Sequence, residues 1–196
     1  KSFSMGAVTA KMEAEIAEQL DVPYVLCTTS GSMALTMGLM AAGVGPGDEV
    51  IVPTRTFIAT AHAASLLGAR VVLVDSRSES PNMDVAEAAK KITPQTKAIM
   101  PVHLNGRVCD MAAIRALAEK HGLTVIEDAC QGIFSHGADG FQCMLGDCGC
   151  FSFSMVKLVS TGQGGAIVTR SENLYEKLAA LRNHGVADVV SHIYLT

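Results

Sequence analysis

Charged residues are scarce in this sequence, and no stretch of it is strongly basic. Lysine, arginine, aspartate and glutamate make up 17% of the 196 residues, and the formal net charge is −4. Proteins whose main partner is a nucleic acid usually carry a basic patch or a basic run. The composition therefore argues against a nucleic-acid partner.

Long apolar runs are also missing. A membrane-spanning helix needs about 18 or more apolar residues in a row, and no such run occurs although 49% of the residues are hydrophobic. The first residues do not have the pattern of a signal peptide, so we expect a soluble, cytoplasmic protein with no membrane partner. An apolar chain with few charges is typical of a sheet covered by helices on both faces. Its length suits one domain with a full core.

The six cysteines lack the spacing of a metal site. Free cysteine buries readily and a reducing compartment disfavours disulfides, so we interpret them as reduced core residues. A zinc site built from Cys143, Cys148, Cys150 and His136 would lack the C-x-x-C spacing of zinc ribbons, and we expect no metal. The glycines at 162, 164 and 165 do not form G-x-G-x-x-G, so a dinucleotide fingerprint is missing too.

Strands and helices alternate along the chain, which predicts an α/β fold with a mainly parallel sheet. Right-handed crossovers between parallel strands bring the loops that follow them to one edge of the sheet. The predicted strands cover residues 24–27, 49–52, 71–74, 98–102, 124–128, 148–153 and 165–169. Predicted helices include residues 7–20, 85–92, 111–121 and 171–183.

A small, hydroxyl-rich turn follows the first predicted strand. Ser30 and Ser32 supply capping groups for a helix that begins there, and Gly31 lets another chain segment approach closely. Free amides and the helix dipole make such a helix start an anion site. An ordinary capped helix explains the same residues, and both interpretations stay open at this point.

One lysine lies between the last two predicted strands. Burial lowers the pKa of an ammonium because desolvation penalises the charged form, and a neutral amine can attack a carbonyl. Lys157 is therefore a candidate nucleophile, although a lysine whose head reaches solvent is the alternative. Asp128 follows another strand, where it would serve a ligand or cap a helix near residue 129.

Together these residues supply what pyridoxal phosphate (PLP) requires. PLP needs a lysine, a carboxylate for its pyridine nitrogen and donors for its phosphate. Asp128 would keep the ring nitrogen protonated, which makes the ring an electron sink. Phe57, which also follows a strand, would stack on the ring.

Seven short motifs between residues 6 and 185 carry a resemblance to a known family. They are TSGSMAL (29–35), VPTRTFIAT (52–60), PVHLNG (101–106), EDACQ (127–131), GCFSF (149–153), GGAIVT (164–169) and LRNHG (181–185). With them the sequence resembles the sugar-nucleotide aminotransferases, a family of fold-type-I PLP enzymes in the aspartate-aminotransferase superfamily. The resemblance implies a three-layer sandwich with a mainly parallel seven-stranded sheet, which is the large domain of such enzymes.

The resemblance also implies roles for individual residues. Lys157 would form a Schiff base with PLP, and Asp128 would pair with the pyridine nitrogen. Gln131 would lie near the 3-hydroxyl side of the cofactor, and Phe57 would cover the ring. The residues that would hold the phosphate are Gly31, Ser32, Met33 and Ser152.

Three departures from the family pattern stand out. Ser32 replaces the usual threonine and keeps the hydroxyl. Residues 154–158 read Ser-Met-Val-Lys-Leu where the family commonly has a Tyr-Pro-Thr-Lys-Asn-like run, which affects the shape of the loop and its substrate contacts. Family members are nearly twice as long, with a small C-terminal domain. We therefore expect residues 1–196 to be the PLP-binding large domain alone, from a fragment or an incompletely traced chain.

By this resemblance we expect an aminotransferase that moves an amino group from glutamate, or glutamine, to a keto-sugar that is nucleotide-linked. Lys157 argues against the dehydratase relatives, which carry histidine there. The alternatives are another fold-type-I PLP enzyme, such as a lyase or a desulfurase, and a non-catalytic regulatory module. Because the family builds each site from two subunits, we expect a homodimer with the cofactor close to the interface.

Overall fold

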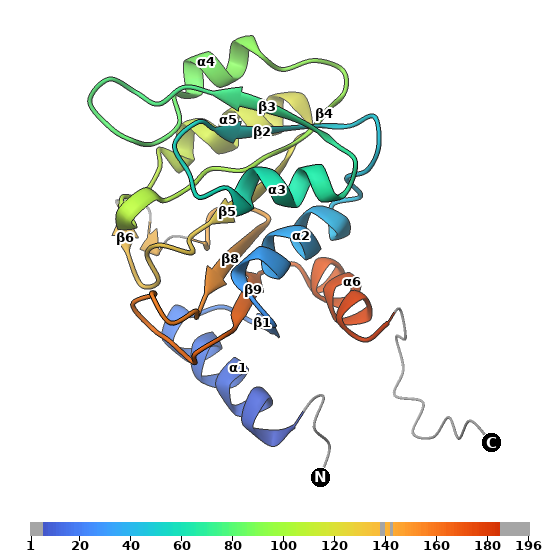
Figure 1. Cartoon of the computed structure of the whole chain (residues 1–196), viewed down its shortest axis with the longest axis vertical. Coiled ribbons are helices and arrows are strands. Elements are labelled where there is room, and N and C mark those ends of the chain that lie inside the picture. The colour runs from blue at the N-terminus through green and yellow to red at the C-terminus, as the bar shows by residue number, and fades with distance from the viewer. Residues whose placement is uncertain (1–5, 138–139, 142, 185–196) are drawn as a thin grey trace, which may run out of the picture.

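The computed structural model describes residues 6–137, 140–141 and 143–184 and shows a sheet between two layers of helices (Figure 1). Across the sheet the strands follow the order β1-β9-β8-β5-β4-β2-β3. The strands from β8 to β3 pair in parallel, and antiparallel pairing adds β9 and β1. This confirms the predicted, mainly parallel sheet of seven strands. They are β1 (Tyr24–Thr28), β2 (Glu49–Pro53), β3 (Arg70–Val74), β4 (Thr96–Ile99), β5 (Thr124–Asp128), β8 (Cys148–Ser152) and β9 (Gly165–Thr169).

The helices in the described part of the chain are α1 (Ala7–Leu20), α2 (Gly31–Ala41), α3 (Ala59–Leu66), α4 (Val85–Lys90), α5 (Met111–His121) and α6 (Glu172–Arg182). Of these, α1 and α5 have the predicted bounds, whereas α4 ends two residues before the predicted end at 92. A short ribbon of β6 (His136–Gly137) and β7 (Gly140–Phe141) was not predicted. Strands of two residues are too short to show an alternating pattern.

Helices cover both faces of the sheet. Alternate residues of a strand point to opposite faces, so each strand contributes side chains to the core on both sides. Val50 and Ile126 lie in a core cluster with residues of α2, α3 and α6. Their neighbours Ile51 and Val125 lie in a second cluster with residues of α4 and α5. Near the β1 edge, residues of α1 cover Phe151 on this second face. The predicted three-layer sandwich is therefore confirmed.

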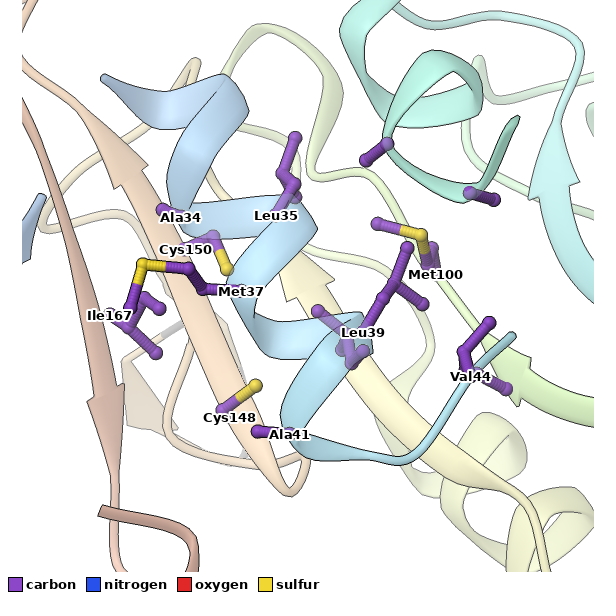
Figure 2. Close-up of a cluster of buried hydrophobic side chains, with 14 of the residues drawn as sticks. Ala34, Leu35, Met37, Leu39, Ala41, Val44, Met100, Cys148, Cys150 and Ile167 are labelled. Carbon is purple, nitrogen blue, oxygen red and sulfur yellow. The ribbon is translucent and has the colours of Figure 1, made fainter. Parts of the chain in front are cut away.

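The helix α2 is buried over most of its length, with eight of its eleven residues in the core. Figure 2 shows it lying over the first face of the sheet, with Met37 toward Cys150 and Ile167 and with Leu39 toward Met100. Packing of this density leaves little freedom for the helix to shift. The first turn of α2 is thereby held at the edge of the sheet where the parallel strands end.

All six cysteines are free thiols. Four of them are buried, as we expect for core residues: Cys109, Cys143, Cys148 and Cys150. Burial raises the pKa of Cys27 to about 11 and that of Cys109 to about 12, so both thiols are neutral at neutral pH. Within the described ranges, no three His, Cys, Asp or Glu residues are grouped as a metal site requires. No helix in these ranges is both long and apolar enough to cross a membrane.

Candidate active site

The first turn of α2 offers free backbone donors. Ser30 is its N-cap, with an extended backbone, and its Oγ accepts a hydrogen bond from the amide of Met33 at 3.1 Å. The first bond of the helix runs from the amide of Ala34 to the carbonyl of Ser30 at 3.0 Å. The amides of Gly31 and Ser32 therefore have no acceptor within the helix. They lie at the positive end of the helix dipole, where an anion is stabilised.

Gly31 lets the end of β8 pack directly against this turn. A Cβ atom at Gly31 would lie 2.7 Å from the Cβ of Ser152 and 2.9 Å from the Sγ of Cys130. Real Cβ atoms do not approach other atoms this closely, so only glycine fits. The contact places the hydroxyl-bearing Ser152 beside the free amides of α2.

Asp128 ends β5 and is 5% exposed. Its amide donates to the carbonyl of Pro101 at 2.9 Å, and its carbonyl accepts from the amide of His103 at 3.0 Å. Its Oδ1 accepts from the amide of Cys130 at 3.1 Å, and its Oδ2 accepts from the hydroxyl of Thr60 at 2.7 Å. The alternative role as a helix cap is wrong, because the chain forms turns rather than a helix between β5 and β6.

The side chain of Gln131 is oriented by a backbone donor. Its Oε1 accepts from the amide of Asn105 at 3.1 Å. Asn105 lies in a short 3-10 turn, Leu104–Gly106, and has a left-handed backbone with φ of 54°. An amide N–H can face only the oxygen of a glutamine, so the NH2 group of Gln131 is left as a donor.

Lys157 lies in the loop between β8 and β9, and this loop is fixed near its ends. The amide of Phe153 donates to the carbonyl of Gly164 at 2.8 Å, and the amide of Thr161 donates to the carbonyl of Phe153 at 3.0 Å. Inside the loop, the amide of Lys157 donates to the carbonyl of Ser154 at 3.0 Å. These bonds close the loop across the edge of the sheet.

The apolar neighbours of Lys157 in the sequence do not bury it. Met155, Val156 and Leu158 are 80%, 88% and 79% exposed, and Lys157 itself is half-buried. Its apolar sequence neighbours therefore do not enclose this lysine. A loop that projects beyond the sheet turns such side chains outward, which residue composition alone does not reveal.

These elements surround a cavity of about 320 Å³ at the edge of the sheet where the parallel strands end. Its lining includes residues of α2, α3, β5 and β8 and of the loops that follow the strands. The predicted site residues that line it are Gly31, Ser32, Phe57, Asp128, Gln131, Ser152 and Lys157. The structure thus brings together seven of the eight predicted residues.

Met33 is the exception. Its side chain is 43% exposed and lines a different hollow, beside Arg182, and its amide already donates to Ser30. Phe57 does line the cavity, but it is 65% exposed and stands at the cavity rim. An aromatic ring in this position can cover a ligand from the solvent side.

Cys130 lines the cavity together with its two charged residues, Asp128 and Lys157. Burial raises the pKa of its thiol well above the usual range, the negative charge of Asp128 raises it further, and the charge of Lys157 lowers it. A thiol with a raised pKa is a poor nucleophile at neutral pH. Since Lys157 and Asp128 are the charged residues in the lining, Lys157 is the candidate nucleophile of this cavity.

The residues of the cavity fit PLP. The amides of Gly31 and Ser32 and the hydroxyls of Ser32 and Ser152 are the neutral donors that bind a phosphate at a helix start. The buried carboxylate of Asp128 suits a protonated ring nitrogen, and the amine of Lys157 suits an aldehyde. The volume lies at the lower end of the range for small-molecule sites.

Several lining residues carried no role in the sequence analysis, among them Cys130, Ser154 and Gln163. Thr60 is a further one, since it contacts Asp128 from α3. Thr60 is the last residue of the motif VPTRTFIAT (52–60), three residues after Phe57. Its place in this motif was the one sign in the sequence that Thr60 lies near the site.

A second cavity of about 420 Å³ shares Lys157, Gln131 and Ser152 with the first.

The chain is similar to known proteins over almost its whole length. Residues 1–194 match the DegT/DnrJ/EryC1/StrS aminotransferase family. A GDP-perosamine synthase of Caulobacter vibrioides is 42% identical over 183 residues, which are 93% of this chain and 49% of that protein. A UDP-N-acetyl-3-dehydro-alpha-D-glucosamine 3-aminotransferase of Acidithiobacillus ferrooxidans is 46% identical over 192 residues, 97% of this chain and 52% of that protein.

Among solved structures, that of NtdA from Bacillus subtilis with bound cofactor PMP is similar over 97% of this chain and 43% of its own. The TM-score is 0.90 and the sequence identity is 35%. This likeness extends over both helical layers and the sheet. The chain spans about half the length of the curated relatives that it matches.

Proposed function

Because the chain belongs to the DegT/DnrJ/EryC1/StrS aminotransferase family, we propose that it is the PLP-binding large domain of an enzyme that transfers an amino group to a sugar. The acceptor is a keto-sugar linked to a nucleotide, and the donor is glutamate or glutamine. Relatives named for GDP- and UDP-linked sugars support the class of acceptor. A cytoplasmic homodimer is part of the same proposal.

One observation carries this proposal. Seven residues that the sequence assigns to PLP line one cavity, although they come from four separate stretches of the chain, at 31–32, 57, 128–131 and 152–157. Lys157 and Asp128, which have opposite charges and different tasks, both belong to this set. If these residues had only structural roles, there would be no reason for all seven to line the same cavity.

Binding of the cofactor is the first task of these residues. The amides of Gly31 and Ser32, with the hydroxyls of Ser32 and Ser152, would hold the phosphate. The NH2 group of Gln131, which Asn105 leaves free to donate, would face the 3-hydroxyl side of the ring. Phe57 would cover the ring and exclude water. Met33 would contribute through its bond to Ser30, which fixes the first turn of α2.

Two residues would perform the chemistry. When bound, PLP supplies an electron sink for the charge left on a substrate carbon that loses a proton. Asp128 would hold a proton on the ring nitrogen, because a nearby carboxylate raises the pKa of that nitrogen. Lys157 would hold the cofactor through Nζ and would then act as the base that moves the proton.

Amino transfer from glutamate tests the proposal directly. The protein would be loaded with PLP and mixed with glutamate, and formation of 2-oxoglutarate would be measured in a single turnover. We expect transfer by the native protein and none by Lys157→Ala. Lys177→Ala is the matched control, since Lys177 is an exposed lysine of α6. Transfer by Lys157→Ala at the native rate would refute the assignment.

A further inference from the structure

A buried threonine touches the carboxylate that the proposed function places under the cofactor ring. Thr60 lies in the first turn of α3 and is fully buried. Its Oγ1 is 2.7 Å from Oδ2 of Asp128, although 68 residues separate the two in the sequence. A second threonine follows, because Oγ1 of Thr56 lies 2.6 Å from Oγ1 of Thr60.

The direction of these hydrogen bonds follows from the number of protons. The hydroxyl of Thr60 carries one proton, and three acceptors lie within reach: Oγ1 of Thr56 at 2.6 Å, Oδ2 of Asp128 at 2.7 Å and the carbonyl of Phe57 at 3.1 Å. The carboxylate oxygen of Asp128 is the charged one and therefore the strongest acceptor of the three. Thr60 therefore donates to Asp128.

The proton of Thr56 is then fixed as well. Since Thr60 uses its proton on Asp128, the short contact between the two hydroxyls requires Thr56 to donate to Thr60. The other acceptor near Thr56 is the carbonyl of Phe57, at the longer distance of 3.3 Å. Hydrogen bonds in such a chain polarise and strengthen one another. The result is a directed chain from Thr56 through Thr60 to Asp128.

The two oxygens of Asp128 are held from different sides. Oδ2 accepts from Thr60 of α3, and Oδ1 accepts from the amide of Cys130 just beyond β5. A carboxylate held at both oxygens cannot rotate freely about its side-chain bonds. It retains acceptor capacity, because an ionised carboxylate accepts about four hydrogen bonds.

We propose that Thr60 is a positioning residue, which holds the carboxylate of Asp128 in the orientation that pairs with the ring nitrogen of PLP, and that Thr56 fixes the direction of the Thr60 hydroxyl. This inference rests on the proposed function and deepens it. Thr60 does not itself line the cavity. It acts on the ring through Asp128, by keeping the carboxylate where its charge is most effective.

The test compares the state of the ring nitrogen in several variants. PLP isotopically labelled at the ring nitrogen is bound to the protein, and the nitrogen signal is recorded by NMR at one pH. In the native protein we expect the signal of a protonated nitrogen, and in Asp128→Asn that of a neutral one. Thr60→Val, which keeps the shape and removes the hydroxyl, should lie between the two, with turnover lowered about tenfold. Thr60→Ser keeps the donor and should restore the native signal.

A matched control separates positioning from stability. Thr93 donates to the buried carboxylate of Glu49 at the same distance of 2.7 Å, but at the start of β2, which is the opposite edge of the sheet. Thr93 is half-buried, and Thr93→Val removes a threonine–carboxylate bond of the same length, which should leave the nitrogen signal and the turnover unchanged. If Thr60→Val fails to fold, Thr60→Ala makes the same comparison with less crowding.

The outcomes are distinct. A native nitrogen signal in Thr60→Val, with only a lower melting temperature, would overturn the positioning role and leave the proposed function intact. A native protein that binds no PLP would overturn both. A smaller shift in Thr56→Val than in Thr60→Val supports the order of the chain, and the reverse order contradicts it.

Discussion

Glu127 and Asp128 are consecutive carboxylates at the end of β5, and they face opposite sides of the sheet. Glu127 is fully buried and accepts four hydrogen bonds, from Nε2 of His103 and from the amides of Cys143, Leu145 and Gly146, at 2.5 to 2.8 Å. Asp128 is almost as buried, but its carboxylate accepts two hydrogen bonds, from the hydroxyl of Thr60 and the amide of Cys130, and it borders a cavity.

The difference lies in spare acceptor capacity. An ionised carboxylate has about four acceptor sites, so Glu127 has none left, whereas Asp128 keeps about two. The donors of Glu127 hold the segment that leads into β8, which makes Glu127 a structural anchor. Asp128 lines the same cavity as Lys157, so its free acceptor capacity is available to a ligand in that cavity. Burial alone does not distinguish a structural carboxylate from one that can bind a ligand. The number of hydrogen bonds that each carboxylate accepts from the protein does.

The largest expected effect is on stability, from Glu127→Ala. Removal of the carboxylate leaves buried donors without an acceptor, including His103, whose Nδ1 already accepts from the amide of Cys109 at 3.1 Å. We expect a loss of about 3 to 5 kcal/mol in the free energy of unfolding, measured by urea denaturation. A variant as stable as the native protein would show that these bonds contribute nothing.

Asp128→Asn should show the opposite pattern. The shape of the side chain is kept and the charge is lost, so the ring nitrogen no longer has a negative partner. We expect single-turnover amino transfer to fall about 10²-fold, while the free energy of unfolding changes by about 1 kcal/mol. A destabilised variant with native activity would make Asp128 a second structural anchor and would end the contrast with Glu127.

Position along the chain made part of this site predictable. The strands are short apolar runs, so Asp128 and Lys157 could be assigned to strand ends and to one edge of the sheet. The donors around Glu127 could not be assigned, because they come from two other segments of the chain. Thr60 meets Asp128 across 68 residues, and no local pattern encodes that contact. The outward direction of Met155 and Val156 depends on the loop shape, which follows from bonds to Phe153.

Gly31→Ala tests the phosphate end of the same cavity. The added Cβ would overlap Ser152 and Cys130, so the turn of α2 must move away from β8. We expect a stability loss of about 1 to 3 kcal/mol together with weaker PLP binding, measured by fluorescence titration. Gly45→Ala is the control, because a Cβ there meets no atom within 4 Å. If Gly31→Ala and Gly45→Ala bound PLP with equal affinity, the first turn of α2 would not be part of the phosphate site.

The smallest expected effect concerns the thiol of Cys130. After burial, the charge of Asp128 is the next largest cause of its raised pKa. Asp128→Asn removes that charge, so the pKa falls and more thiolate is present at a given pH. We expect alkylation of Cys130 by iodoacetamide to become several-fold faster, on the order of threefold to tenfold.

Cys109 is the internal standard for that measurement. Burial, followed by the charge of Glu127, raises its pKa to about 12, so Asp128→Asn should leave its alkylation unchanged. Mass spectrometry of the digested protein reports both thiols in one sample. Equal acceleration at the two sites would indicate general loosening of the fold rather than loss of one charge.

Covalent attachment of PLP is the most direct test of the cavity as a cofactor site. The protein is incubated with PLP, reduced with borohydride to fix the linkage, digested and mapped by mass spectrometry. We expect one modified lysine, Lys157, and loss of the modification in Lys157→Ala but not in Lys177→Ala. Modification spread over exposed lysines such as Lys177, with none at Lys157, would contradict this expectation.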